Sequence, residues 1–241
     1  MTIADRAVLV TGANRGLGRA LVEEALRRGA QRVYAGTRQP LARADARVTP
    51  LTLDVTEAAQ IQAAVERVGS LDVLINNAGV DLQGEVSDRD LLERHLAVNL
   101  FGTYGVTQAF VPLLTRSRGA IVNVLSVAAV AALPFTPTYS ISEAAALNLT
   151  QALRALLAAR GVQVHAVLAG PIDTEMTRYL DIPKASPQSV AREIFDGVEN
   201  GEEEIFPDPL SASMAEGWRG GTAKALERQF AALIDVAPVE S

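Results

Sequence analysis

The sequence contains no cysteine among its 241 residues and only two histidines. Without a thiol, the protein can form no disulfide bond, no thiolate zinc site, no iron–sulfur cluster and no cysteine nucleophile. Two histidines are too few for a histidine-based metal centre without added carboxylates, so we expect no bound metal. Basic residues are fewer than acidic ones, and a formal charge of −6 argues against nucleic acid as a partner, because phosphates require a basic surface.

Long apolar runs are absent as well. No stretch reaches the ~20 apolar residues that span a bilayer, and the first residues lack the basic and apolar regions of a signal peptide. We therefore expect a cytoplasmic protein with no membrane partner. Hydrophobic residues nevertheless make up 49% of the chain, which is ample for a folded core. Because repeats and linker-like segments are missing, we predict one domain over residues 1–241.

Short apolar segments alternate along the chain with longer segments of helical periodicity. Several of the short segments are continuously apolar, which is typical of strands buried on both faces of a parallel sheet. The alternation predicts an α/β fold with a single-domain, Rossmann-type, doubly wound parallel sheet. We expect strands at residues 7–10, 32–35, 48–53, 73–75, 120–125, 162–168 and 205–206, and helices at residues 18–28, 57–68, 88–108 (with a break near 102–105), 139–160 and 187–200.

The segment that follows the sixth predicted strand is irregular and rich in proline. Irregular segments beyond the carboxyl edge of a sheet often cover bound ligands. We therefore predict a substrate lid over residues 175–214. Its side chains Met176, Tyr179, Leu180 and Ile182 suggest a small-molecule substrate of apolar or aromatic character.

A glycine-rich turn joins the first predicted strand to the first predicted helix. Glycines at these spacings permit a tight turn and let the backbone approach a pyrophosphate closely. The N-terminus of the following helix offers free N–H groups and a positive dipole end, which favour an anion. The pattern predicts a dinucleotide site that includes Gly12, Asn14, Arg15, Gly16, Leu17 and Gly18.

The end of the second predicted strand indicates which dinucleotide binds. Proteins that bind NAD place an acidic residue there to hold the ribose 2′-hydroxyl. Residues 33–38 contain no carboxylate, and they end in Thr37 and Arg38. A guanidinium matches a phosphate dianion by bidentate geometry, and Arg15 lies in the glycine loop nearby. We therefore expect NADP(H) rather than NAD(H), with Thr37 and Arg38 among the cofactor-binding residues.

Further motifs follow the glycine loop in a fixed order: Asp54-Val55, Asn76-Asn77-Ala78-Gly79, Asn99, Ser126, Tyr139 and the segment 170–174. Together with the glycine loop, they resemble the classical short-chain dehydrogenase/reductase family over nearly the whole chain. The resemblance implies carbonyl/alcohol oxidoreduction with a nicotinamide dinucleotide. It also implies a homodimer or homotetramer packed through the long helices at residues 88–108 and 139–160. By the same resemblance Asp54 and Val55 flank the adenine, Asn77, Ala78 and Gly79 line the nucleotide, and Ile172 and Thr174 contact the nicotinamide end.

The resemblance also implies a catalytic set. In the family a tyrosine exchanges the proton with the substrate oxygen, a serine hydrogen-bonds that oxygen, and an asparagine holds a water in the proton relay. A lysine four residues after the tyrosine binds the nicotinamide ribose and lowers the pKa of the tyrosine. Tyr139, Ser126 and Asn99 fill three of these positions, and Tyr139 also counts among the cofactor-binding residues. The fourth position is occupied by Glu143 instead of lysine.

This departure has an electrostatic consequence, because residues i and i+4 are neighbours on one helix face. A unit charge ~6 Å from the phenol, at an effective dielectric constant of 20, is worth roughly 2.8 kcal/mol or two pKa units. An ionised Glu143 would therefore raise the pKa of Tyr139, whereas lysine would lower it. The change disfavours alcohol oxidation, which needs a tyrosinate base, more than it disfavours carbonyl reduction.

Three interpretations remain open at this stage. The protein is a reductase weakened by Glu143, a scaffold that only binds nucleotide, or a site in which Tyr139 and Glu143 form a general acid/base pair for a non-redox reaction. Two further acids, Asp81 and Glu85, follow the asparagine–glycine turn where substrate is expected. We interpret both as solvated loop residues.

Overall fold

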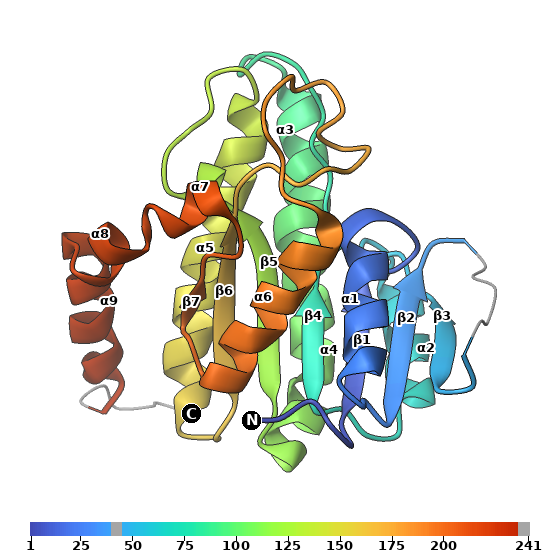
Figure 1. The fold of residues 1–241 in the computed structure, drawn as a ribbon. Helices are drawn as coiled ribbons and strands as arrows, with labels where there is room; N and C mark the ends of the chain where they lie inside the picture. Colours follow the sequence, from blue (N-terminus) through green and yellow to red (C-terminus); the bar gives the residue numbers. More distant parts are fainter. Residues whose placement is uncertain (40–44, 236–241) are drawn as a thin grey trace.

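The computed structural model describes residues 1–39 and 45–235 (Figure 1). The remaining residues of the predicted domain 1–241 lie outside this described part. Seven parallel strands form one sheet in the order β3-β2-β1-β4-β5-β6-β7, which confirms the predicted doubly wound α/β fold. The strands are β1 (Ala7–Thr11), β2 (Arg32–Thr37), β3 (Val48–Thr52), β4 (Val73–Asn76), β5 (Ala120–Ser126), β6 (Gln163–Ala169) and β7 (Glu204–Ile205).

Helices cover both faces of this sheet. Figure 1 shows α1 and α6 in front of the strands and α2, α4 and α5 behind them. The helices have the bounds α1 (Gly16–Arg27), α2 (Ala58–Arg67), α3 (Arg89–His95), α4 (Thr103–Ser117), α5 (Pro137–Ala158), α6 (Pro187–Asn200), α7 (Pro209–Ala212), α8 (Ala215–Arg219) and α9 (Thr222–Ala231).

Strand β1 shows why the apolar runs form a central sheet. Val8 and Val10 join the core beneath α1 and α6, whereas Leu9 between them joins the core beneath α2, α4 and α5. Successive strand side chains point to opposite faces, so a strand with helices on both sides must be apolar at every position. All three side chains are fully buried.

The predicted helix at residues 88–108 consists of three pieces. Helix α3 ends at His95, a π-helical segment spans Leu96–Gly102, and α4 follows directly. The broken region therefore lies mainly before residue 102 and not at 102–105. A π-helical turn widens the backbone and often marks a functional position in a helix. Here the widened segment carries Asn99 into the site described below.

The C-terminal helices lie beside the β7 edge of the sheet (Figure 1). Lys224 of α9 is buried and forms ion pairs with Glu203, Glu204 and Glu227, while Arg154 of α5 pairs with Glu204 and Glu227. The sequence did not predict this cluster or the helices α7, α8 and α9.

Trp218 of α8 packs against a small apolar cluster that contains Leu125, Leu147 and Leu168. The ring therefore attaches α8 to β5, β6 and α5. Within residues 1–39 and 45–235, no helix is long and apolar enough to cross a bilayer.

Candidate active site

The predicted site residues meet at the carboxyl edge of the sheet, where β1, β4 and β5 are neighbours. Strand β1 runs into the glycine loop, β4 into the turn at residues 76–79, and β5 ends at Ser126. The strand order reverses between β1 and β4, and the crevice at such a switch point is the usual ligand site of an open α/β sheet.

The glycine loop has the tight geometry that its sequence predicts. Gly12 has φ +64°, a conformation that side chains disfavour. A Cβ atom at Gly18 would lie 2.1 Å from the carbonyl oxygen of Gly12, so α1 begins in direct contact with the loop. Asn14 and Arg15 are exposed, whereas the side chain of Leu17 is buried in the core, so only its backbone can face a ligand.

Thr11 fastens this loop to the turn after β4, a role that the sequence did not reveal. Its hydroxyl oxygen accepts hydrogen bonds from the backbone N–H groups of Asn77 and Ala78, both at 3.0 Å. The side-chain amide of Asn77 donates to the carbonyl oxygens of Thr11 at 2.9 Å and Gly12 at 3.3 Å. These contacts hold residues 77–79 against the glycine loop.

The residues predicted to hold a 2′-phosphate lie in different surroundings. Thr37 is buried, and its hydroxyl donates to the backbone carbonyl of Gln39. Arg38 is exposed and lies near Asp54. Burial acts to raise the pKa of Asp54, but hydrogen bonds from Thr56, and to a smaller extent the charge of Arg38, lower it below its ordinary value. Arg15 forms an exposed ion pair with Glu175, a partner that the sequence did not suggest.

The other predicted cofactor residues border the same edge. The carboxylate of Asp54 accepts hydrogen bonds from the backbone N–H and hydroxyl of Thr56, and Val55 is buried beside the π-helical segment against Gly102. Thr174 lies over the glycine loop, with its methyl carbon 3.2 Å from the position of a Cβ at Gly16. Ile172 forms an isolated parallel bridge with Ala185.

Tyr139 and Ser126 come together as predicted. Tyr139 lies in the first turn of α5, and its side chain lies close enough to Ser126, at the end of β5, for the Ser126 hydroxyl to influence the pKa of the phenol. Burial raises the pKa of Tyr139 well above its ordinary value, Glu143 raises it further, and the Ser126 hydroxyl opposes both. The phenol is therefore protonated at neutral pH.

Glu143 does not act as the fixed negative charge that we expected from the sequence. It is 5% exposed, and its Oε2 accepts a hydrogen bond from the backbone N–H of Ser126 at 2.8 Å. Burial raises the pKa of Glu143 to about 8, with the Ser126 N–H opposing and Asp81 adding to the shift. At pH 7 the carboxyl is protonated by about ten to one, so burial of Tyr139 is the larger cause of its raised pKa.

Asn99 is held by three hydrogen bonds. Its Oδ1 accepts from the Val80 N–H at 2.9 Å, and its amide donates to the Val80 carbonyl at 3.0 Å and to Ser142 Oγ at 2.9 Å. Both amide hydrogens of the side chain are therefore engaged, while Oδ1 keeps one lone pair that can accept a further hydrogen bond. Ser142 was not identified from the sequence.

Asp81 is not the solvated loop residue that we expected. It is half-buried, and its Oδ2 accepts a hydrogen bond from the Tyr179 hydroxyl at 2.8 Å. Its Oδ1 is buried without a hydrogen-bond partner among the described residues. Burial raises the pKa of Asp81, against the hydrogen bond from Tyr179 and the charge of His95. Glu85, by contrast, is exposed as expected.

His95 completes the surroundings of Tyr139. The imidazole is fully buried, and its Nε2 accepts a hydrogen bond from the Leu82 N–H at 2.9 Å. Its ring lies edge-on to the ring of Tyr139, with the two ring centroids 6.0 Å apart. Burial lowers the pKa of His95, so the ring is neutral, with its proton on Nδ1. The histidine thus packs beside the phenol.

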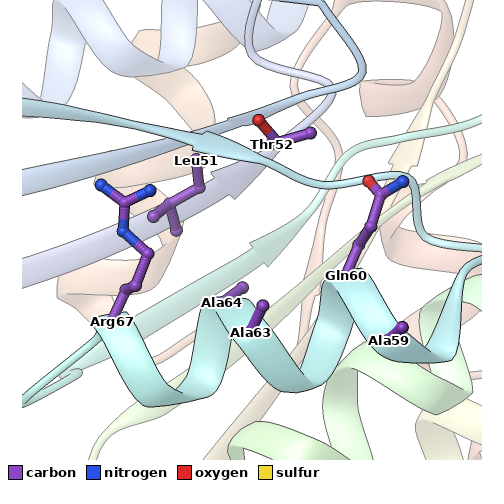
Figure 2. A pocket seen from close by; sticks show the side chains of 7 residues that line it. All are labelled: Leu51, Thr52, Ala59, Gln60, Ala63, Ala64 and Arg67. Carbon is purple, nitrogen blue, oxygen red and sulfur yellow. The ribbon is translucent and has the colours of Figure 1, made fainter.

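A separate cavity of about 230 Å³ lies between β3 and α2 at the other edge of the sheet. Figure 2 shows its lining, in which Gln60 and Arg67 are the long polar side chains and small alanines face the strand. None of the residues around Tyr139 lines it, so we do not assign the site there.

Comparisons with known proteins show what the chain is similar to. A family model described as short chain dehydrogenase matches residues 6–184. The chain is 34% identical over 208 residues to 2-(S)-hydroxypropyl-CoM dehydrogenase 3 of Xanthobacter autotrophicus, a match that covers 80% of this chain and 82% of that protein.

Solved structures show the same likeness. A short chain dehydrogenase from Burkholderia cenocepacia in complex with NADP is 38% identical and superimposes with a TM-score of 0.87, covering 95% of this chain and 98% of that one. A gluconate 5-dehydrogenase from the same species, in complex with NADP and tartrate, is 25% identical, with a TM-score of 0.80 and coverage of 88% and 97%. The chain therefore belongs to the short-chain dehydrogenase family.

Proposed function

We propose that this protein is an NADP(H)-dependent carbonyl/alcohol oxidoreductase that acts on small molecules. The proposal depends on one observation above all, the proximity of the Tyr139 phenol and the Ser126 hydroxyl at the carboxyl edge of the sheet. The relatives named above are dehydrogenases, and two of them hold NADP. The comparisons give no support to the non-redox or binding-only alternatives.

The residues at the glycine loop fit a dinucleotide phosphate. The close contact at Gly18 keeps side chains out of the loop, so the backbone N–H groups at the start of α1 can reach a pyrophosphate. Strand β2 ends in Thr37 without a carboxylate, and both Arg15 and Arg38 are accessible to a 2′-phosphate. When bound, the nicotinamide supplies the hydride in reduction and takes it up in oxidation.

Tyr139 and Ser126 have distinct parts in the proposed reaction. The Ser126 hydroxyl orients the carbonyl oxygen of the substrate, and the Tyr139 phenol donates its proton to that oxygen as the carbonyl carbon accepts hydride. Because the pKa of Tyr139 is raised, the phenol keeps its proton at neutral pH and is present as a donor, although it is a weak acid. Oxidation needs tyrosinate as the base, and little tyrosinate is present at that pH. We therefore infer that reduction is favoured over oxidation, and that both are slower than with lysine at position 143.

Glu143 acts in this proposal as a positioning residue. Its neutral carboxyl holds the backbone of Ser126 and thereby the end of β5. It can also offer a hydrogen bond to ribose hydroxyls, but it brings no positive charge to the phenol.

The test measures the consumption of NADPH with a panel of aldehydes and ketones. The loss of nicotinamide absorbance reports this consumption. We expect slow turnover by the wild type, a loss of about 10²–10⁴-fold in kcat for Tyr139→Phe, and faster turnover for Glu143→Lys. NADPH affinity, measured by calorimetry, should change little in Tyr139→Phe. Turnover that persists unchanged in Tyr139→Phe would contradict the proposed mechanism.

We also propose a smaller lid than the sequence suggested. Within residues 175–214, helix α6 has fully buried side chains such as Ile194 and Phe195 and packs onto α1, so it belongs to the body of the domain. The segment at residues 173–186 is the part that lies above the sheet edge, near α3 (Figure 1). Its exposed Met176, Tyr179 and Ile182 support a substrate with an apolar portion.

The proposed assembly is a homo-oligomer packed through α4 and α5. Large apolar side chains remain exposed on these elements and on the π-helical segment beside them, with Leu156 at 60% and Phe101 at 62%. Such exposure on two adjacent long helices favours an interface between copies of the chain.

A further inference from the structure

We propose that Asp81 determines substrate specificity by binding a protonated amine next to the carbonyl or hydroxyl group of the substrate. The site would then accept amino ketones and amino alcohols and disfavour anionic keto and hydroxy acids. This inference rests on the proposed function, because it places the substrate beside Tyr139.

The position of Asp81 is the first observation. It follows Gly79 by two residues, so it leaves the turn that borders the glycine loop. Its Oδ2 is bound to Tyr179 of the lid segment, 98 residues away in the chain. The carboxyl group therefore lies between the sheet edge and the lid, where a substrate must sit to reach Tyr139.

The second observation is an unused acceptor. Asp81 Oδ1 is buried and has no hydrogen-bond partner in the described part of the chain. Asp81 also takes part in no ion pair among those residues. A buried carboxylate oxygen without a partner carries a desolvation penalty, and a charge-assisted hydrogen bond from a ligand would remove it.

The surroundings specify the sign of the ligand. Tyr179 donates to Asp81 Oδ2 as a neutral phenol, and Asp81 has no basic partner among the described residues. Asp81 is also near enough to Tyr139 and Glu143 for its charge to raise the pKa of both groups. In its ionised form the carboxylate therefore attracts an ammonium group and repels a second carboxylate.

The experiment uses three stable alcohols that differ in one group: phenylethanolamine, phenylethanediol and mandelate. Their dissociation constants are measured by calorimetry with NADPH present, which prevents turnover of an alcohol, and again without nucleotide. We expect phenylethanolamine to bind about tenfold more tightly than the diol, and mandelate to bind most weakly. A wild type that binds the diol or mandelate as well as the amine would overturn the inference without any variant.

Three variants locate the effect. Asp81→Asn should bring the ratio between amine and diol affinity close to one while leaving diol affinity within about twofold, whereas Glu85→Gln, at an exposed acid of the same segment, should keep the ratio. Tyr179→Phe leaves the carboxylate in place and should also keep the amine preference. An unchanged ratio in Asp81→Asn would overturn the inference. Absence of NADPH turnover would contradict the proposed function alone, because the alcohol affinities do not depend on turnover.

Discussion

At the scale of single residues, Glu143 shows how burial decides the chemistry of a charged side chain. Its carboxyl is enclosed at the end of β5 and satisfied in part by the Ser126 N–H. A group in that position gains more from keeping its proton than from ionising. The residue therefore contributes a hydrogen-bond acceptor to the site at neutral pH and becomes a negative charge only near its pKa of about 8.

The ionisation of Glu143 should make the free energy of unfolding depend on pH. The pKa of Glu143 is about 8 in the folded protein and ordinarily 4.5. Between these values the unfolded chain is ionised while the folded chain keeps its proton, so the free energy of unfolding decreases as the pH rises. Glu143→Gln cannot ionise and should be more stable than the wild type by about 2–4 kcal/mol at pH 8, with little difference at pH 4.5.

Urea unfolding at several pH values between 4.5 and 8.5 measures this difference. Glu85→Gln is the matched control, because Glu85 is exposed and its substitution should leave the pH dependence unchanged. Parallel stability curves for Glu143→Gln and the wild type would show that Glu143 is ionised in the folded protein.

The sequence predicted where the candidate catalytic residues lie better than it predicted their charge. Tyr139 and Ser126 are recognisable from their order and spacing, and the structure places them near each other. The proton on Glu143 and the enclosure of Asp81 depend on neighbours from β5, α3 and the lid segment. Burial of that kind arises from contacts across the fold, so a local pattern does not reveal it.

At the scale of elements, the glycine loop and the lid segment are joined before any cofactor binds. Arg15 and Glu175 form the joining ion pair, and their side chains are 62% and 55% exposed. Exposed pairs contribute little to stability, so this contact can open easily. The ion pair still engages the guanidinium of Arg15, which we assign to the 2′-phosphate.

The second prediction follows from that competition. Glu175→Gln should release Arg15 and tighten NADPH binding by about two- to fivefold, since an exposed pair is worth a fraction of 1 kcal/mol to about 1 kcal/mol. NADH, which has no 2′-phosphate, should bind with unchanged affinity. Calorimetric titration of both nucleotides measures the effect. Glu23→Gln is the control, because Glu23 forms a comparably exposed pair with Arg19. An equal gain for both nucleotides would place Arg15 at the pyrophosphate instead.

Element boundaries were harder to predict than element types. The strands extend further toward the carboxyl edge than their apolar runs, to Thr11, Thr37 and Asn76, because backbone pairing continues where polar side chains begin to line the site. The interruption of the 88–108 helix was predicted from glycines, but the structure places it at the π-helical segment around Asn99. Within this segment Asn99 forms hydrogen bonds to Val80 and Ser142, which lie far away in the sequence, so the local pattern does not show these contacts.

At the scale of the whole molecule, a buried ion cluster attaches the C-terminal region to the sheet. Lys224 is 2% exposed and contacts carboxylates from the β7 region and from its own helix. The sequence shows these residues only as an acidic run and a lysine in a polar helix. Their association requires α5, β7 and α9 to be assembled, and sequence spacing does not contain that information.

Substitution of Lys224 tests this attachment. Lys224→Met leaves Glu204 and Glu227 buried with Arg154 as their remaining basic partner, so we expect a loss of about 2–4 kcal/mol in the free energy of unfolding. High salt should not reproduce the loss, because buried pairs are weakly screened. Urea unfolding at two ionic strengths measures both. The exposed pair of Arg89 and Glu93 provides the control, and Arg89→Ala should cost no more than about 0.5 kcal/mol.

The packing of Trp218 gives the molecule a built-in optical probe. It is the only tryptophan in the chain, and it packs against the apolar cluster that contains Leu125, Leu147 and Leu168, with Nε1 buried. Its emission therefore reports the local polarity at the point where α8 contacts the sheet. A red shift that precedes the loss of helical circular dichroism would show the C-terminal region detaching as a separate cooperative unit, while a simultaneous change would show that it unfolds with the rest of the domain.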